Sequence, residues 1–178
     1  MAIKMKIFKH FCTITHHRLL VCKHCFKVGL IWQGLTHDLS KYSFTEFFRG
    51  AKYYDGHKSP NEVEREKKGY SEAWMHHKGR NKHHFEYWTD YSKEEGRYIP
   101  VKMPLKYVKE MFCDRVAASK VYKGKDYTDS CAFDYLTSRS KVDIMHPDTY
   151  NLLYKLLLML KDKGEKETFK YIKHLKEY

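Results

Sequence analysis

The spacing of inward-facing residues constrains the fold of this chain more than any other sequence feature. Between residues 10 and 28, apolar residues and histidines recur at alternating intervals of four and three, at His10, Ile14, His17, Val21, His24 and Val28. Residues at these intervals share one face of an α-helix. A second run with the same period comprises Tyr107, Met111, Asp114, Ala118 and Val121. No alternating strand pattern of useful length appears, so the sequence predicts an all-α fold.

Local start and stop signals predict where the other helices lie. Ser43 and Glu46 form a capping-box pattern that opens a helix through Ala51. Pro60 suits the first turn of a helix that we expect to run past Gly69 to about residue 77. The remaining expectations are a loop over 78–82, a short helix starting at residue 83, an exposed connection over 89–100, a helix over 104–122, irregular or partly helical chain over 123–141, a Leu-rich helix from 147 to about 164, and a short closing helix.

Length and composition favour one folded domain. The chain has 178 residues, of which 42% are hydrophobic and 16% aromatic, and such a composition argues against disorder. No shift in composition marks a boundary between two domains. We therefore expect a single compact helical domain over residues 1–178, with a core over about 10–164 and a short C-terminal helix over 165–178.

The chain is strongly basic. Its 34 Lys and Arg outnumber its 22 Asp and Glu, which gives a net charge of +12, so its surface should attract phosphates, nucleic acid or acidic lipid. Lysines near the N-terminus interrupt any apolar run long enough for a signal sequence, and no segment approaches a membrane span. The five cysteines show no disulfide framework. We expect a cytoplasmic protein without a membrane partner.

Two metal-binding side chains, His37 and Asp38, stand next to each other. A neutral imidazole and a carboxylate both bind divalent cations. Nitrogen and oxygen donors without thiolates suit Mn, Fe, Co, Ni or Zn in a hydrolytic site. Two-residue matches are common, so the value of the pair depends on partners among the 12 histidines and the carboxylates of the chain.

Helical phase favours His17 as one such partner. His17 lies on the apolar face of the first predicted helix, whereas His16 shares its face with Lys23 and Lys27 and should contact water. A buried histidine satisfied by a hydrogen bond is the alternative. Beside His37 and Asp38, we predict that His17 is a metal ligand.

Asp114 makes an independent case, because it lies in the middle of an apolar face. An unpaired buried carboxylate costs too much free energy to persist, so Asp114 should bind a metal or a counter-charge. The alternative is a salt bridge to Arg115, Lys120 or Arg80. Glu110, one turn earlier, is predicted to accept a hydrogen bond that orients a ligand histidine.

A later histidine group offers further ligands. His77 shares a helical face with apolar residues, whereas His76 lies beside polar ones, so His77 is the predicted ligand of the two. His83 and His84 follow a loop, where phase cannot rank them, and either or both could reach a metal.

The order of these residues resembles that of the HD-domain superfamily of metal-dependent phosphohydrolases. Those proteins are all-helical, and their ligands occur in the order histidine, His-Asp pair and distant aspartate. Some members insert further histidines that hold a second metal. The resemblance implies an HD-domain-like fold, with a first ion at His17, His37, Asp38 and Asp114. It also implies a second ion at His77 with His83 or His84, and Asp38 between the two.

The chain resembles more closely a family of uncharacterised bacterial and phage proteins. They share the segments GLxHDLSKYS-EF and AWxHHKGRNKHHxEYW, which occur here from Gly34 and Ala73. The likeness extends from about residue 16 to residue 164. That family has no established activity to carry over.

These observations lead to one functional hypothesis. The chain is expected to be a phosphohydrolase that uses one or two divalent ions to activate water against a small phosphorylated, possibly nucleotide, substrate. Asp38 and Lys41 are the predicted catalytic residues, and Lys41, Arg80 and Lys82 are predicted to bind the phosphate. For Lys41, the alternative is a lysine on a helix surface.

Two other functions are compatible with the sequence. The first is a basic helical module that binds nucleic acid, in which the histidines are structural. The second is a non-hydrolytic metal protein, such as an iron oxygenase. The donor set alone does not select the metal.

Overall fold

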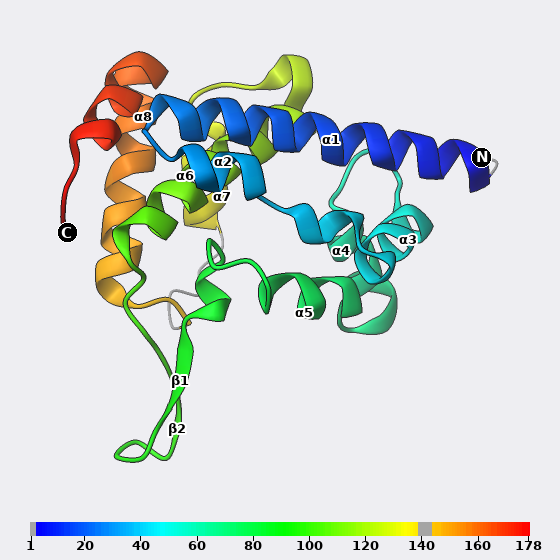
Figure 1. The fold of residues 1–178 in the computed structure, drawn as a ribbon, viewed down its shortest axis with the longest axis horizontal. Coiled ribbons are helices and arrows are strands. Elements are labelled where there is room, and N and C mark those ends of the chain that lie inside the picture. The colour runs from blue at the N-terminus through cyan, green and yellow to red at the C-terminus, as the bar shows by residue number, and fades with distance from the viewer. Residues whose placement is uncertain (1–2, 139–143) are drawn as a thin grey trace.

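The computed structural model describes residues 3–138 and 144–178 and confirms the all-α prediction (Figure 1). The α-helices are α1 (Ile3–Lys27), α2 (Ile31–Thr36), α3 (Phe44–Tyr53), α4 (Pro60–Lys68), α5 (Glu72–Lys78), α6 (Leu105–Lys123), α7 (Cys131–Ser138) and α8 (Pro147–His174). Three short 3₁₀ segments join them: η1 (Leu39–Tyr42), η2 (Phe85–Tyr87) and η3 (Gly124–Asp126). None of the described helices has the length and apolar character needed to cross a membrane.

Helix α1 connects two groups of helices. Figure 1 shows α3 and α4 near its N-terminal half, and α8 at its C-terminal end. The apolar core lies at that C-terminal end, where α1, α6, α7 and α8 meet. Its fully buried members include Val21, Cys25, Val108, Phe112, Val116, Leu153, Leu156, Leu157 and Leu160. The middle of α1, between the two groups, is where the polar residues considered below are gathered.

The single helix expected from Pro60 to about His77 is wrong, because the chain breaks between α4 and α5. Gly69 adopts a left-handed conformation with φ 82°, and its N–H donates to Arg65 O. Glycine is favoured there because it has no Cβ to clash. Ser71 then caps α5, with its Oγ accepting from Trp74 N. The break turns α5 so that His77 is buried.

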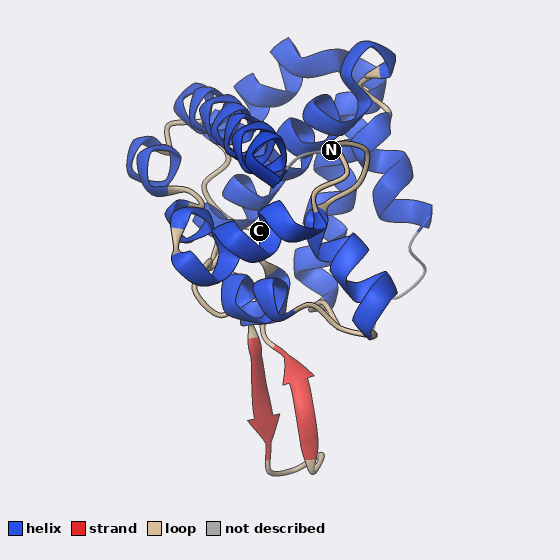
Figure 2. Ribbon diagram, turned by 90° about the vertical axis from the view of Figure 1, so that its right-hand side faces the viewer, coloured by secondary structure: helices blue, strands red, loops and turns tan. Residues whose placement is uncertain are grey.

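The described chain also contains two short strands, which no alternating pattern in the sequence predicted. Thr89–Ser92 (β1) pairs with Arg97–Pro100 (β2) as an antiparallel hairpin that projects from the helices (Figure 2). Most of its side chains are exposed on both faces. Sequence alternation appears only when one face of a strand is buried, which explains why no strand pattern was visible. The expectation of an exposed segment is confirmed.

The other boundaries agree more closely with expectation. Helix α6 matches the helix expected over 104–122, and α1 begins several residues before residue 10. His83 lies outside a helix, because η2 starts only at Phe85. Helix α7 lies within the segment expected to be partly helical, whose last residues, 139–141, are outside the described part. Gly164, with φ 75° and ψ 175°, interrupts α8 where the Leu-rich helix was expected to end.

The contact between α1 and α3 depends on the absence of a side chain at Gly50. A Cβ placed there would lie 2.4 Å from Nε2 of the buried His10 ring. Alanine favours helix by about 1 kcal/mol over glycine. The clash should outweigh this gain, so we expect Gly50→Ala to lower the free energy of unfolding by about 1–3 kcal/mol, measured by urea denaturation.

Gly79→Ala is the matched control. Gly79 has the helical φ of −75°, and its added Cβ would meet only ordinary contacts at 3.5 Å or more. This change should leave the free energy of unfolding within about 1 kcal/mol of wild type. Equal losses for the two variants would contradict the close packing inferred for Gly50.

Buried His24 should make stability depend on pH. Burial lowers its pKa from 6.5 to about 4, despite a contact of 3.3 Å between its Nδ1 and Cys113 O. Below pH 6.5 the unfolded chain takes up a proton at this position that the folded chain does not. The contribution of neutral His24 to the free energy of unfolding is therefore fully present above pH 6.5. It is lost as pH falls toward 4, by up to about 3 kcal/mol. His24→Gln should give a shallower loss of unfolding free energy between pH 7 and 4, and an unchanged slope would refute this.

Candidate metal centre

All seven residues predicted to bind metal come together beside the middle of α1. His17 comes from α1, and His37 and Asp38 come from the turn between α2 and η1. Helix α5 supplies His77, the segment before η2 supplies His83 and His84, and α6 supplies Asp114. The exposed His16 takes no part, as predicted.

The turn that carries His37 and Asp38 is fixed by its backbone. His37 N donates to Gln33 O, and Arg18 Nε of α1 donates to His37 O at 2.7 Å. Asp38 has φ 53° and ψ 27°, and it is the only non-glycine residue in the described part of the chain with a positive φ. The left-handed conformation costs about 1–2 kcal/mol for an ordinary residue and is more easily tolerated by Asp. Strained residues of this kind often occur at functional sites.

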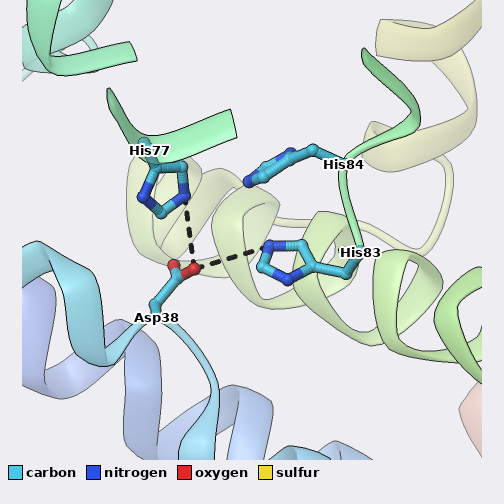
Figure 3. A group of neighbouring side chains, drawn as sticks. All are labelled: Asp38, His77, His83 and His84. Carbon is cyan, nitrogen blue, oxygen red and sulfur yellow. Dashed lines mark ion pairs between the residues drawn. The ribbon is translucent and has the colours of Figure 1, made fainter. Parts of the chain in front are cut away.

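Each oxygen of the buried Asp38 carboxylate faces a different set of side chains. Oδ1 lies 3.3 Å from His77 Nε2 and 3.4 Å from His83 Nε2, with the His84 ring pointing into the same space (Figure 3). Oδ2 lies 3.3 Å from His37 Nε2 and 3.6 Å from His17 Nε2. The carboxylate therefore lies between two groups of side chains.

Both groups have the compactness of a metal site. Asp38, His77, His83 and His84 each offer one donor atom within 4.8 Å of the others. His17, His37, Asp38 and Asp114 do the same. In this second group, Asp114 Oδ1 lies 3.0 Å from His17 Nε2 and 3.5 Å from His37 Nε2. His17, His37 and Asp38 are at most 6% exposed.

Several buried atoms in these groups make no hydrogen bond. They are His17 Nε2, His37 Nε2, His83 Nε2, His84 Nε2 and both Asp38 oxygens. The ammonium of Lys41, 2.6 Å from Asp38 Oδ2, supplies part of the compensation as an ion pair. Buried polar atoms without partners are costly and rare in folded proteins. Divalent ions between these atoms would satisfy them, so the residues present fit a metal centre.

Carboxylates behind the histidines fix which ring nitrogen points inward. Glu110 Oε1 lies 2.9 Å from His37 Nδ1 and 3.3 Å from His83 Nδ1. Glu46 Oε2 lies 2.7 Å from His77 Nδ1. A proton donated from Nδ1 to a carboxylate leaves Nε2 free to bind a metal. The predicted contact between Glu110 and a candidate ligand histidine is confirmed.

The role of Glu46 was missed by the sequence analysis. Ser43 Oγ accepts from Glu46 N at 3.4 Å, as a capping box requires, but the Glu46 side chain contacts His76 and His77. A signal was available, because Glu46 shares the buried face of α3 with Gly50 at the helical interval that singled out Asp114. Ser40, whose Oγ lies 3.3 Å from His77 Nδ1, gave no such signal.

The charges in the centre shift one another's pKa values. Burial alone would lower the pKa of His37, but Asp38, Asp114 and Glu110 raise it well above its usual value. Burial opposes ionisation of Asp38, yet His37 and Lys41 hold its pKa well below the usual range. Burial also lowers the pKa of His84 well below its usual value. The carboxylates thus favour the protonated form of His37, and a cation bound at its Nε2 would compete with that proton.

The three predicted phosphate-binding residues lie in two places. Lys41 is in η1, where its side chain is 26% exposed and its Nζ lies 2.6 Å from Asp38 Oδ2. Arg80 and Lys82 are exposed and line a cavity of about 350 Å³ that extends to His37, His83 and Glu110. Lys106 and Trp32, which the sequence analysis did not single out, line the same cavity.

Two of the three proposed salt-bridge partners of Asp114, Lys120 and Arg80, contact other groups. Lys120, one of the three proposed partners, forms an ion pair with Glu165. The close neighbours of Asp114 Oδ1 are instead Nε2 of the candidate ligands His17 and His37. Arg80 donates to His76 O at 3.3 Å. The geometry of Asp114 therefore agrees with a ligand role.

Comparison with known proteins identifies the family of the chain but not its function. No curated protein and no solved structure matches the chain. The link to the HD-domain superfamily thus stays a prediction. A family model described as a family of unknown function, DUF5662, matches residues 6–159. The chain therefore belongs to the DUF5662 family.

Proposed function

We propose that this protein is a metal-dependent phosphohydrolase with two ions held on either side of Asp38. The observation that carries the proposal is the position of the Asp38 carboxylate, whose two oxygens face separate groups of buried, unsatisfied donors. A bridging carboxylate is a frequent feature of two-metal hydrolytic sites. The order of the residues along the chain, which resembles that of HD-domain hydrolases, supports the same proposal.

The donor set suits Mn, Fe, Co, Ni or Zn, because it consists of imidazoles and carboxylates. When bound, such ions supply a water of lowered pKa and neutralise charge on a phosphoryl group. The residues of the chain hold these donors in place: Glu110 orients His37 and His83, while Glu46 orients His77.

The cavity beside the centre supports an anionic substrate. Arg80, Lys82 and Lys106 line it together with the buried His37 and His83. Guanidinium and ammonium groups bind phosphate oxygens by charge-assisted hydrogen bonds. Lys41 does not line this cavity; its ammonium lies next to Asp38 Oδ2. The nearby carboxylates raise the pKa of Lys41, although burial opposes this, so it stays charged and acts electrostatically.

The two alternatives account for less of the geometry. A nucleic-acid-binding module would need basic surface, but it would leave the buried unsatisfied atoms of the centre without a purpose. An iron oxygenase would use the same donors, so the reaction itself must separate it from a hydrolase. Oxygen consumption with iron bound and no phosphate release would select the oxygenase.

Metal content of matched variants tests the two-ion arrangement. Asp38→Asn should lose both ions, because Asp38 belongs to both groups, and phosphate release should fall by at least about 10²-fold. Asp114→Asn should weaken binding of the ion in its own donor group, and His77→Ala should weaken binding of the ion in the other group. Metal is measured by mass spectrometry after reloading, and activity with a panel of phosphomonoesters, phosphodiesters and nucleotides.

Asp134→Asn serves as the control for this series, because its carboxylate is 58% exposed and pairs with Lys161 on the surface. It should change neither metal content nor activity. A natively folded wild-type protein that binds no metal, with unfolding unaffected by Asp38→Asn, would overturn the metal centre. Bound metal without phosphate release from any substrate would overturn the hydrolase assignment alone.

Glu110→Gln tests the orienting carboxylate. The amide keeps an accepting oxygen but loses the negative charge that favours an Nδ1 proton on His37 and His83, so metal affinity should fall by about 10–100-fold. The measurement is a competition titration against a fluorescent chelator. Glu66→Gln, on the exposed side of α4 where it pairs with Lys58, should leave affinity unchanged. Equal affinities for wild type and Glu110→Gln would refute the orienting role.

A further inference from the structure

Large apolar side chains are exposed where α1 passes α3. We call this surface the aromatic face and define it by Met5, Phe8, Phe11, Phe44 and Phe48. Phe8 is 67% exposed and Phe44 is 80% exposed. Figure 1 shows the N-terminal part of α1 near α3, at the end of the molecule away from α8. Scattered exposed apolar residues are ordinary, but a contiguous group of this size marks an interaction surface.

Ring contacts join the α1 and α3 parts of the aromatic face, and Met5, Phe8 and Phe11 follow one another at intervals of three along α1. Phe11 contacts the ring of Phe47, with centroids 6.5 Å apart, and Phe47 contacts Phe48 at 5.4 Å. Phe48 in turn contacts Phe44 at 4.7 Å. The side chains of two helices thus form one apolar surface. Neither α1 nor α3 needs these exposed rings for its own buried face, which consists of other residues.

The two helices that carry the aromatic face, α1 and α3, expose basic but no acidic side chains. The first 54 residues contain only two carboxylates, Asp38 and Glu46, and both are buried in the metal centre. The described surface of residues 3–54 therefore carries no exposed carboxylate. Lys4, Lys9 and Lys52 are exposed on the same helices as the apolar rings. An apolar stripe flanked by lysines is the pattern of a helix that lies on an anionic lipid surface.

We propose that the aromatic face binds the surface of a membrane rich in anionic lipid, with its rings among the acyl chains and its lysines at the phosphates. A second copy of the chain fits less well, because a two-fold interface would bring the lysines of both copies together. The expectation of no membrane partner rested on the lack of a span, and surface binding requires none. The proposal is independent of the metal centre and of its reaction.

Vesicle sedimentation of the full-length protein tests the proposal. Vesicles of phosphatidylcholine mixed with phosphatidylglycerol should bind it at least about tenfold better than phosphatidylcholine alone, since each lysine near an anionic surface contributes to attraction. Raising NaCl from about 0.1 M to about 0.5 M should weaken binding, because the screening length shortens. Phe8→Ser combined with Phe44→Ser should reduce binding by about tenfold or more, because less apolar area is buried.

The matched control changes two exposed rings elsewhere. Tyr91 and Tyr98 of the hairpin are 54% and 73% exposed, and Tyr91→Ser combined with Tyr98→Ser should leave vesicle binding unchanged. No binding of the wild type to phosphatidylglycerol vesicles, or an equal loss in the control, would overturn the proposal. It would also be overturned if light scattering showed a wild-type dimer that the Phe8 and Phe44 changes convert to a monomer, since a second copy would then occupy the face.

Discussion

The buried carboxylate of Asp38 is the constraint on which the rest of this structure depends. A buried negative charge must be compensated by nearby positive or hydrogen-bonding groups. Here the Lys41 ammonium pairs with one oxygen of Asp38, and imidazoles lie close to both oxygens. The backbone accepts a left-handed conformation to place it there. Its close neighbours come from segments far apart in sequence: His17 of α1, Lys41 of η1, His77 of α5 and His83 before η2. The arrangement of the helices therefore serves the electrostatics of one side chain as much as it serves an apolar core.

The polar centre and the apolar core occupy different parts of the same helices. Helix α6 packs Phe112 and Val116 into the core and presents Glu110 and Asp114 to the centre. The two carboxylates are one helical turn apart, so a rigid helix sets the distance between the orienting group and the candidate ligand. Helix α1 does the same with Val21 and His17. The core at one end of α1 thus fixes the positions of donors that would otherwise repel one another.

The helical periodicity of the sequence predicted most of the centre, because residues three or four positions apart lie on the same face of a helix. It separated His17 from His16 and found Asp114 and Glu110, all of which lie on long helices with a clear apolar face. It failed for Glu46, whose capping pattern concealed a buried side chain, and for Lys106, whose cavity is formed by segments far apart in the chain. The hairpin and the break at Gly69 were missed for other reasons. The hairpin has no buried face and therefore no alternating pattern. Gly69 was expected inside a helix, but its left-handed conformation ends α4 there.

The sharing of Glu110 between His37 and His83 has a thermodynamic consequence. These histidines belong to different donor groups, yet both contact the same carboxylate oxygen. Anything that orders or displaces one ring alters the charge and position of the acceptor that the other ring uses. If both groups hold ions as proposed, binding at one group would change the affinity of the other, and the linkage would be reciprocal, by the same factor in both directions. The two sites would then fill cooperatively or anticooperatively rather than independently.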